Sequence, residues 1–152
     1  MYVTVAAEAD MPRILEIEQE AISPPWTHGT LLSEIYREDS FFAVARQVCQ
    51  EKSPPVTLGF VILRRIADEG ELFQIAVDRA AQRSGVADML MDSALNYASE
   101  NALASVYLEV RKSNEAAINL YKKHGFKSVR HRNEYYNDPV EDAVVMVLFM
   151  TV

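Results

Sequence analysis

The sequence predicts a mixed α/β fold, in which about four helices flank a mostly antiparallel central sheet of about seven strands. One observation is the periodicity of apolar residues, which is two in some segments and helical in others. A second is the order of these segments, strand-helix-helix-strand-strand-strand-helix-strand-helix-strand-strand. That order is not the regular alternation of a Rossmann fold.

The N-terminal segments alternate between strand and helix signals. Tyr2 to Ala6 reads as a short strand, and Asp10 is predicted to cap a helix that carries Pro12 in its first turn. The pair Pro24-Pro25 ends this helix, and Thr27 to Arg37 is predicted to form a second, shorter helix.

Three strands are predicted next. Phe41 to Gln47 and Val56 to Ile66 have strand-like sequences, joined by the polar loop CQEKSPP, which contains Cys49. The residues Asp68-Glu69-Gly70 are predicted to form a turn, after which the next strand begins at Glu71.

The stretch from Glu71 to Asn101 is the most informative part of the chain. It reads as a buried strand, a turn of small residues from Gln82 to Ala87, and a helix of about four turns. A turn that opens a helix in this way directs unpaired backbone N–H groups and the positive end of the helix dipole at one point. The stretch therefore predicts an anion site, with phosphate as the expected occupant.

The remaining elements complete the sheet. Ser105 to Arg111 alternates as a strand, and Asn114 is a good N-cap for a helix that ends near Gly125. Phe126 to Tyr136 and Ala143 to Met150 are predicted to be the last two strands.

Composition and charge restrict the class of protein. A chain of 152 residues fits one domain, residues 1–152, and its 49% apolar and 24% charged residues are ordinary for a soluble protein. There is no secretory signal or membrane-spanning stretch, and the single cysteine favours a cytoplasmic location. The net charge of −7 argues against non-specific nucleic-acid binding and allows a cationic partner.

The chain resembles the GCN5-related N-acetyltransferases (GNAT) along nearly its whole length. Within that family it is similar to the RimI-type enzymes, which acetylate the N-terminal alanine of a ribosomal protein. The general family motif is Q/R-x-x-G-x-G/A, here residues 82–87. The narrower matches are Pro25-Trp26, ELFQIAVD, LEVRKSNEAAINLYKKHGF, RNEYY and Glu141-Asp142-Ala143.

This resemblance implies a GNAT fold that binds acetyl-CoA through the central strand and the turn. The pantetheine arm would pair with the strand and the pyrophosphate would lie in the turn. The residues that it implies are Ile75, Ala76 and Val77 for the strand, Gln82, Arg83, Ser84, Gly85, Val86, Ala87 and Asp88 for the turn, and Asn114 as a further contact.

Asp88 departs from the RimI-type pattern, in which an arginine is common at this position. A carboxylate in the first turn of a helix suits the helix dipole, but it would repel a pyrophosphate if it faced the turn. We therefore expect the Asp88 side chain to face away from the turn.

Two residues match the catalytic positions of the family. The resemblance implies that Glu109 accepts a proton from the amine and that Tyr121 donates one to the departing thiolate. Glu109 has an alternative role on a solvated sheet face, where it could pair with Arg111. Tyr121 is also spaced as a core residue, so its ring can pack while its hydroxyl reaches the sulfur.

Aromatic residues are the candidates for the acceptor peptide. Trp26 and Tyr135 are expected to line the groove, with Tyr136 as a weaker candidate, although each could belong to the core. The histidines lack metal-ligand spacing, so no metal is expected, and Cys49 lacks the surroundings of a nucleophile.

The function implied is transfer of acetyl from acetyl-CoA to the α-amino group of a protein N-terminus in a ternary complex. The expected acceptor is an alanine-starting ribosomal protein, with no nucleic-acid or membrane partner. One alternative is another protein N-terminus or a small amine. A second, from a different class, is a CoA-binding module without turnover, which would be expected to lack the acid or the base.

Overall fold

The computed structural model describes residues 1–151, and the order of its strands and α-helices is the predicted one. None of the helices in this range is long and apolar enough to cross a lipid bilayer. The chain also has two short 3-10 helices, Glu8–Asp10 and Arg79–Ala81. The bounds are β1 Tyr2–Val5, α1 Met11–Ala21, α2 His28–Ile35, β2 Ser40–Gln47, β3 Val56–Ile66, β4 Glu69–Val77, α3 Val86–Glu100, β5 Ser105–Arg111, α4 Glu115–Lys123, β6 Lys127–Tyr136 and β7 Glu141–Phe149.

The strands form one seven-stranded sheet in the order β1-β2-β3-β4-β5-β7-β6. All neighbours are antiparallel except β4 and β5, which are parallel because α3 connects them as a crossover. This confirms the predicted mixed, mostly antiparallel sheet.

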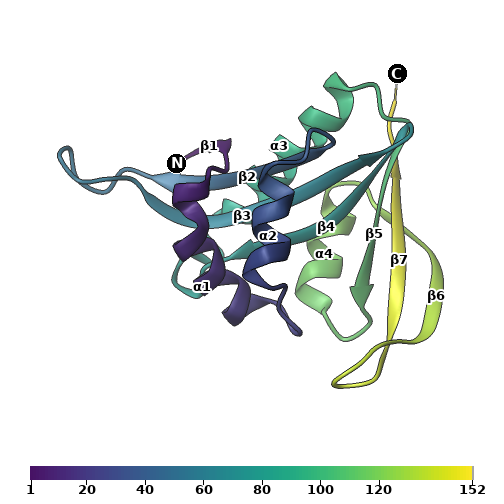
Figure 1. The fold of residues 1–152 in the computed structure, drawn as a ribbon. Helices are drawn as coiled ribbons and strands as arrows, with labels where there is room; N and C mark the ends of the chain where they lie inside the picture. The colour runs from purple at the N-terminus through teal and green to yellow at the C-terminus, as the bar shows by residue number, and fades with distance from the viewer. Residues whose placement is uncertain (152) are drawn as a thin grey trace.

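Helices cover the two faces of the sheet with separate apolar clusters (Figure 1). On one face, Ile14 of α1 and Leu31 of α2 pack against β2 and β3. On the other, Leu90 of α3 and Tyr121 of α4 pack against the central strands and β7. The apolar stripe of each helix is buried, which is what the helical periodicity of the sequence requires.

The hairpin between β3 and β4 is tighter than the sequence suggested. The turn consists of Ala67 and Asp68, and Ala67 has a left-handed φ of 56°. The prediction of a turn at Asp68-Glu69-Gly70 was therefore wrong for its last two residues, which belong to β4. Gly70 is buried in that strand, and a Cβ there would lie 3.1 Å from Leu103 and 3.2 Å from Leu63.

Asp10 is the N-cap residue of α1, as predicted, but its side chain makes no capping hydrogen bond to this helix. Its carboxylate receives two hydrogen bonds from Arg46 of β2, at 2.7 and 2.8 Å, and one from the backbone N–H of Ala7 at 2.8 Å. A charged, bidentate arginine competes successfully with the uncharged helix amides. These contacts join the start of α1 to β2.

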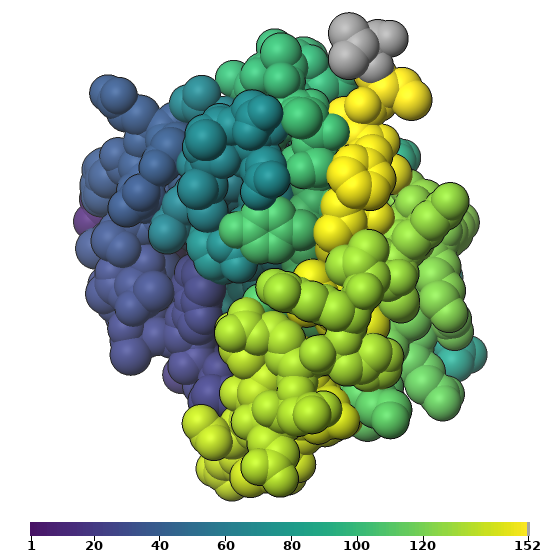
Figure 2. All heavy atoms as spheres, turned by 90° about the vertical axis from the view of Figure 1, so that its right-hand side faces the viewer, coloured from purple at the N-terminus to yellow at the C-terminus, as the bar shows by residue number. Residues whose placement is uncertain are grey.

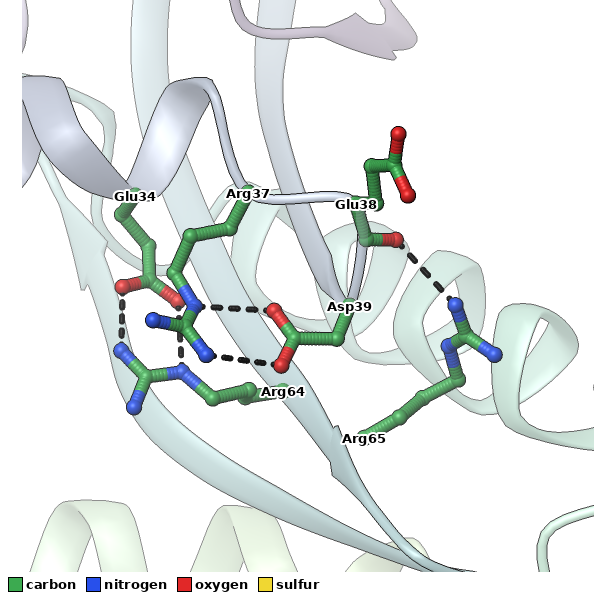
Figure 3. Close-up of polar contacts among 6 residues, drawn as sticks. All are labelled: Glu34, Arg37, Glu38, Asp39, Arg64 and Arg65. Atoms are coloured by element: carbon green, nitrogen blue, oxygen red, sulfur yellow. Dashed lines mark hydrogen bonds and ion pairs between the residues drawn. The ribbon is translucent and has the colours of Figure 1, made fainter.

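A second ion pair, between Glu34 of α2 and Arg64 of β3, is shown in Figure 3. Arg64 donates from Nε and Nη2 to the two carboxylate oxygens of Glu34, whose side chain is only 1% exposed. The Arg64 guanidinium also lies over the Phe73 ring, 4.6 Å from its centre. The pair therefore fixes α2 to the sheet and supports an aromatic side chain of β4.

We expect Arg64→Ala to lower the free energy of unfolding by about 3 kcal/mol, because it leaves the buried Glu34 carboxylate without its partner. Urea denaturation with comparison of midpoints and m-values measures this loss. The matched control is Arg37→Ala, which removes the neighbouring exposed pair with Asp39 and should change stability much less. Equal losses in the two variants would contradict the role given to Glu34 and Arg64.

Candidate active site

The two central strands, β4 and β5, separate partway along their length. They are paired only through Glu69 with Ser105, Gly70 with Val106 and Glu71 with Tyr107, and beyond these residues they diverge (Figure 1). The register between β3 and β4 also shifts here, leaving Phe73 without a partner on β3. Such a bulge bends a strand and increases its local twist. The diverging strands leave backbone groups of β4 and β5 facing an open space.

A cleft of about 750 Å³ occupies this space. Its walls come from the end of α1 and the loop after it, from β4, from β5, from α4 and from the end of β6. Its lining includes Pro25, Trp26, Phe73, Gln74, Ile75, Glu109, Arg111, Asn114, Tyr121, Tyr135 and Tyr136. The structure thus brings together Glu109, Tyr121, Trp26, Tyr135, Asn114 and Ile75, which were predicted from separate segments.

Glu109 lies on β5 and points into the cleft from the sheet face opposite to the α3 and α4 cluster. Its side chain is 16% exposed, and it accepts a hydrogen bond of 2.7 Å from Nη1 of Arg132 on β6. The alternative pairing with Arg111 is not seen, because Arg111 binds other groups. The carboxylate is thus held in place by a residue from the neighbouring hairpin.

Tyr121 lies both in the apolar core and at the wall of the cleft. Its ring packs in the apolar cluster beside Phe126, with 5.9 Å between ring centres, and the residue also lines the cleft. Burial raises the pKa of the Tyr121 phenol well above its ordinary value. The hydroxyl therefore stays protonated and can act as a hydrogen-bond donor.

The turn from Gln82 to Ala87 has the conformation expected of an anion site. Arg83 and Gly85 have left-handed φ angles of 62° and 86°. Gly85 is the N-cap of α3, and no side chain caps this helix. The N–H groups of the first turn are consequently free to bind an anion. A residue other than glycine at position 85 would be strained in this conformation.

Asp88, in the first turn of α3, is engaged by α4. Its carboxylate accepts a hydrogen bond of 3.0 Å from Lys123, and His124 Nε2 lies 2.8 Å from its other oxygen. Hydrogen bonds from His124 and Lys123 hold the pKa of Asp88 below its ordinary value. The negative charge that seemed unfavourable beside a pyrophosphate is thus matched by basic side chains of the next helix.

The segment Ile75 to Val77 is paired with β3 on one side, through Val61, Phe60 and Gly59. Its other edge lies beyond the last pairing with β5. Asn114 caps α4, as predicted, by accepting a hydrogen bond of 3.2 Å from Ala117 N–H. The edge of β4 and the start of α4 therefore border the cleft with backbone groups.

Trp26 and Tyr135 line the cleft from opposite sides. The Trp26 ring packs on Phe73, with 5.6 Å between centres, so it belongs to an apolar cluster as well. Tyr135 is 42% exposed and lies beneath the Arg132 guanidinium, and the nearby Glu109 raises the pKa of its phenol. Tyr136 also lines the cleft, and burial raises its pKa to about 12.

A second groove of about 660 Å³ shares Glu109 and Tyr135 with the cleft and continues across β5, β6 and β7. Glu71 and Tyr107 lie in it, and the Tyr107 hydroxyl donates to Glu71 at 3.2 Å. Burial raises the pKa of Glu71 and raises that of Tyr107 to about 12. Figure 2 faces the β6 and β7 side of the molecule.

The sequence did not predict three residues that line the cleft, Phe73, Gln74 and Arg111, nor the buried Glu18, which is hydrogen-bonded to Gln74. Gln74 and Phe73 read as strand residues, Glu18 as part of an amphipathic helix, and Arg111 as a possible partner of Glu109. In the structure Glu18 is fully buried and accepts hydrogen bonds from Trp26 N–H at 2.7 Å and from Gln74 at 3.0 Å. A glutamate on the apolar side of α1 was the one sequence signal of this arrangement.

The pattern that defines the Acetyltransferase (GNAT) family matches residues 11–126. A "[Ribosomal protein bS18]-alanine N-acetyltransferase" of Haemophilus ducreyi is 34% identical over 94% of this chain and 96% of its own. An "N-alpha-acetyltransferase" of Sulfurisphaera tokodaii is 33% identical over 90% of this chain and 86% of its own.

The crystal structure of the ribosomal-protein-S18-alanine N-acetyltransferase from Escherichia coli is similar throughout. It has 33% sequence identity, covers 99% of this chain and 94% of its own, and gives a TM-score of 0.83. The family match, the sequence identity and the shared fold agree, and the chain belongs to the GNAT family of acetyl-CoA-dependent N-acetyltransferases.

Proposed function

We propose that this chain transfers the acetyl group of acetyl-CoA to the α-amino group of a protein N-terminus, and that the acceptor is the N-terminal alanine of ribosomal protein bS18. The observation that carries the proposal is the opening between β4 and β5, with Glu109 and Tyr121 in one cleft. Several relatives bear the name of this activity, at 32–36% identity. A location in the cytoplasm, where ribosomal proteins are made, belongs to the same proposal.

The residues present fit acetyl-CoA, which would supply an acetyl group activated as a thioester. The free edge of Ile75 to Val77 suits an extended amide-containing chain, which could pair with it as a strand would. The uncapped first turn of α3, with Gly85 at its N-cap, suits a pyrophosphate. The backbone of Gln82 to Asp88 would make these contacts, with the Asp88 side chain held by α4.

Glu109 is the proposed general base. A peptide α-amino group has a pKa of about 8, so a fraction of it is already uncharged at neutral pH. A carboxylate is therefore a strong enough base to remove the remaining proton. The carboxylate lines the cleft, and its contact with Arg132 limits its rotation. It can take the proton directly or through a water molecule.

Tyr121 is the proposed donor to the departing sulfur. The surplus proton leaves the amine and one proton reaches the sulfur, so the products are an amide and a thiol. Because burial raises the pKa of Tyr121 above that of a thiol, complete transfer from the phenol is uphill. Its main contribution is then a hydrogen bond to the sulfur as negative charge develops there.

The thioester oxygen also needs a donor. Backbone N–H groups of Ile75 to Val77 are the candidates, since this edge of β4 has no strand partner and Ile75 lines the cleft. Fixed amides of this kind stabilise developing charge without having to reorganise.

Trp26 and Tyr135 are proposed to hold the first residues of the acceptor. They belong to segments on opposite sides of the cleft, the loop after α1 and the end of β6. Rigid aromatic walls bind a short peptide at a low cost in side-chain entropy.

Two alternatives have specific support. The Sulfurisphaera tokodaii relative is named for α-amino acetylation without a stated acceptor, which keeps other N-termini and small amines open. A CoA-binding module without turnover would share the β4 edge and the turn of residues 82–87, but the presence of both Glu109 and Tyr121 argues against it.

Incubation with acetyl-CoA and a panel of short peptides separates these possibilities. We expect fastest CoA release with a peptide that carries the alanine N-terminus of bS18, and little with its N-formylated form, which lacks a free amine. Comparable rates with unrelated N-termini would contradict the proposed acceptor. Binding of acetyl-CoA without release in any reaction would support the non-catalytic module.

Tyr121→Phe should lower kcat about 100-fold, the range for loss of one acid or base, and leave acetyl-CoA affinity within about twofold. Steady-state kinetics and calorimetric binding measure the two effects. Tyr107→Phe is the matched control, because its hydroxyl contacts Glu71 in the second groove. Unchanged kcat in Tyr121→Phe would remove this residue from the mechanism.

Glu109→Gln should lower kcat/KM about 100-fold near neutral pH. The deficit should shrink above a pH of about 8, where the amine is already neutral before it attacks and only one proton remains to be removed. A pH profile of both enzymes with one peptide tests this. Glu71→Gln removes a nearby carboxylate without touching the proposed base and should keep the wild-type profile. A deficit that is independent of pH would argue against base catalysis by Glu109.

A further inference from the structure

Arg111, the last residue of β5, binds two separate loops beside the cleft. The first is the α1–α2 loop, residues 22–27, and the second is the β6–β7 loop, residues 137–140. Its contacts are Ser23 O at 3.2 Å in the first loop, Asn137 O at 3.2 Å and Pro139 O at 3.0 Å in the second, and Glu141 Oε1 at 3.4 Å at the start of β7.

The two loops come from opposite ends of the chain and meet at the cleft. Ser23, Pro24 and Pro25 line it from one loop, and Asn137 lines it from the other. Figure 2 shows the yellow-green segment around the β6–β7 loop beside the purple N-terminal part of the chain. No backbone hydrogen bond joins the two loops directly within residues 1–151, so the Arg111 side chain is their polar connection.

The chemistry of these contacts requires arginine. A guanidinium group is planar and has five N–H donors, so it can bind carbonyl oxygens that lie in different directions. The Arg111 side chain is 17% exposed, and its guanidinium stacks on the Tyr136 ring at 4.5 Å. The contact with the ring limits the movement of the guanidinium group. A lysine ammonium cannot make the same set of contacts.

The α1–α2 loop is also held at its other end. Trp26 N–H donates to the buried Glu18 carboxylate, which in turn accepts from Gln74 of β4. Glu18 therefore fixes the loop to β4, while Arg111 fixes it to β5 and to the β6–β7 loop. The position of the loop depends on both sides of the parted sheet.

We infer that Arg111 is a positioning residue for the acceptor, which holds the α1–α2 loop and the β6–β7 loop at a fixed separation so that the peptide enters a preformed groove. This inference rests on the proposed function. A preformed groove spares the peptide the cost of ordering two loops. Arg111 therefore acts on peptide affinity through the loops, while Glu109 takes the amine proton and Tyr121 stabilises the departing sulfur.

Arg111→Lys should raise KM for the peptide about tenfold or more, with kcat changed less than about threefold and acetyl-CoA affinity unchanged. Arg111→Met, which also loses the charge, should have the larger effect. The matched control is Arg65→Lys, since Arg65 makes one hydrogen bond of 3.1 Å to the carbonyl of Glu38, far from the cleft (Figure 3). It should keep the wild-type KM.

Hydrogen exchange provides a readout that does not depend on turnover. Without peptide, Arg111→Lys should exchange faster than wild type in residues 22–27 and 136–141 and at the same rate in α3. In wild type, a saturating peptide should protect amides of both loops. Should Arg111→Met not fold, Arg111→Lys and the wild-type protection experiment decide the outcome.

The results separate failure of the inference from failure of the proposed function. If wild type transfers acetyl to peptides but Arg111→Lys keeps its KM and its exchange rates, the inference is overturned. A fall in kcat at constant KM would also overturn it, because it would place Arg111 in the chemistry. If wild type acetylates no peptide, the proposed function fails, and faster loop exchange in Arg111→Lys would still show that Arg111 holds the loops.

Discussion

Beyond Glu71 and Tyr107 the facing edges of β4 and β5 no longer bond to each other, and the rest of the structure depends on this interruption. Backbone amides and carbonyls away from water require partners. A continuous sheet would satisfy them internally, whereas the parted strands offer them to a ligand. The bulge at Phe73 allows the parting, because it bends β4 away while its other edge stays paired with β3.

The walls of the cleft are supported from outside it. Glu34 holds Arg64, Arg64 lies over Phe73, and Phe73 packs on Trp26. The ion pair between α2 and β3 thereby positions Phe73 and, through it, the Trp26 side of the cleft. Glu18 supports the same wall through the backbone of Trp26. Glu34, Arg64 and Glu18 are charged, and their hydrogen bonds have fixed directions. They therefore restrict the α1–α2 loop to one arrangement more strictly than apolar packing alone would.

The sequence was sufficient for the order of strands and helices because amphipathic periodicity is a local property. The turn at Gln82 to Ala87 was also predictable, because glycine and other small residues favour turns through their own backbone conformation, without contacts to distant segments. Contacts between distant segments were not predictable. Arg132 as the partner of Glu109, the Asp88 contacts with α4 and the several partners of Arg111 depend on tertiary structure. The partner of the Asp10 side chain could not be predicted for the same reason, since Arg46 lies 36 residues away in the chain.

The contact of Asp88 with Lys123 and His124 makes the structure sensitive to ionic strength. It joins α3, which packs on β2 to β4, to α4, which follows β5, and thus bridges the two parts of the sheet on the face opposite Arg111. The Lys123 side chain is 66% exposed and that of Asp88 35%, so dissolved ions weaken this bridge at a Debye length of about 8 Å in physiological salt. Arg111, by contrast, binds mainly uncharged carbonyl oxygens, and Glu141 is its one charged partner among the contacts named above, so salt has little charge to screen there. Salt therefore acts unequally on the two faces and weakens the contact beside the turn of residues 82–87 more than the contacts that Arg111 makes with the two loops.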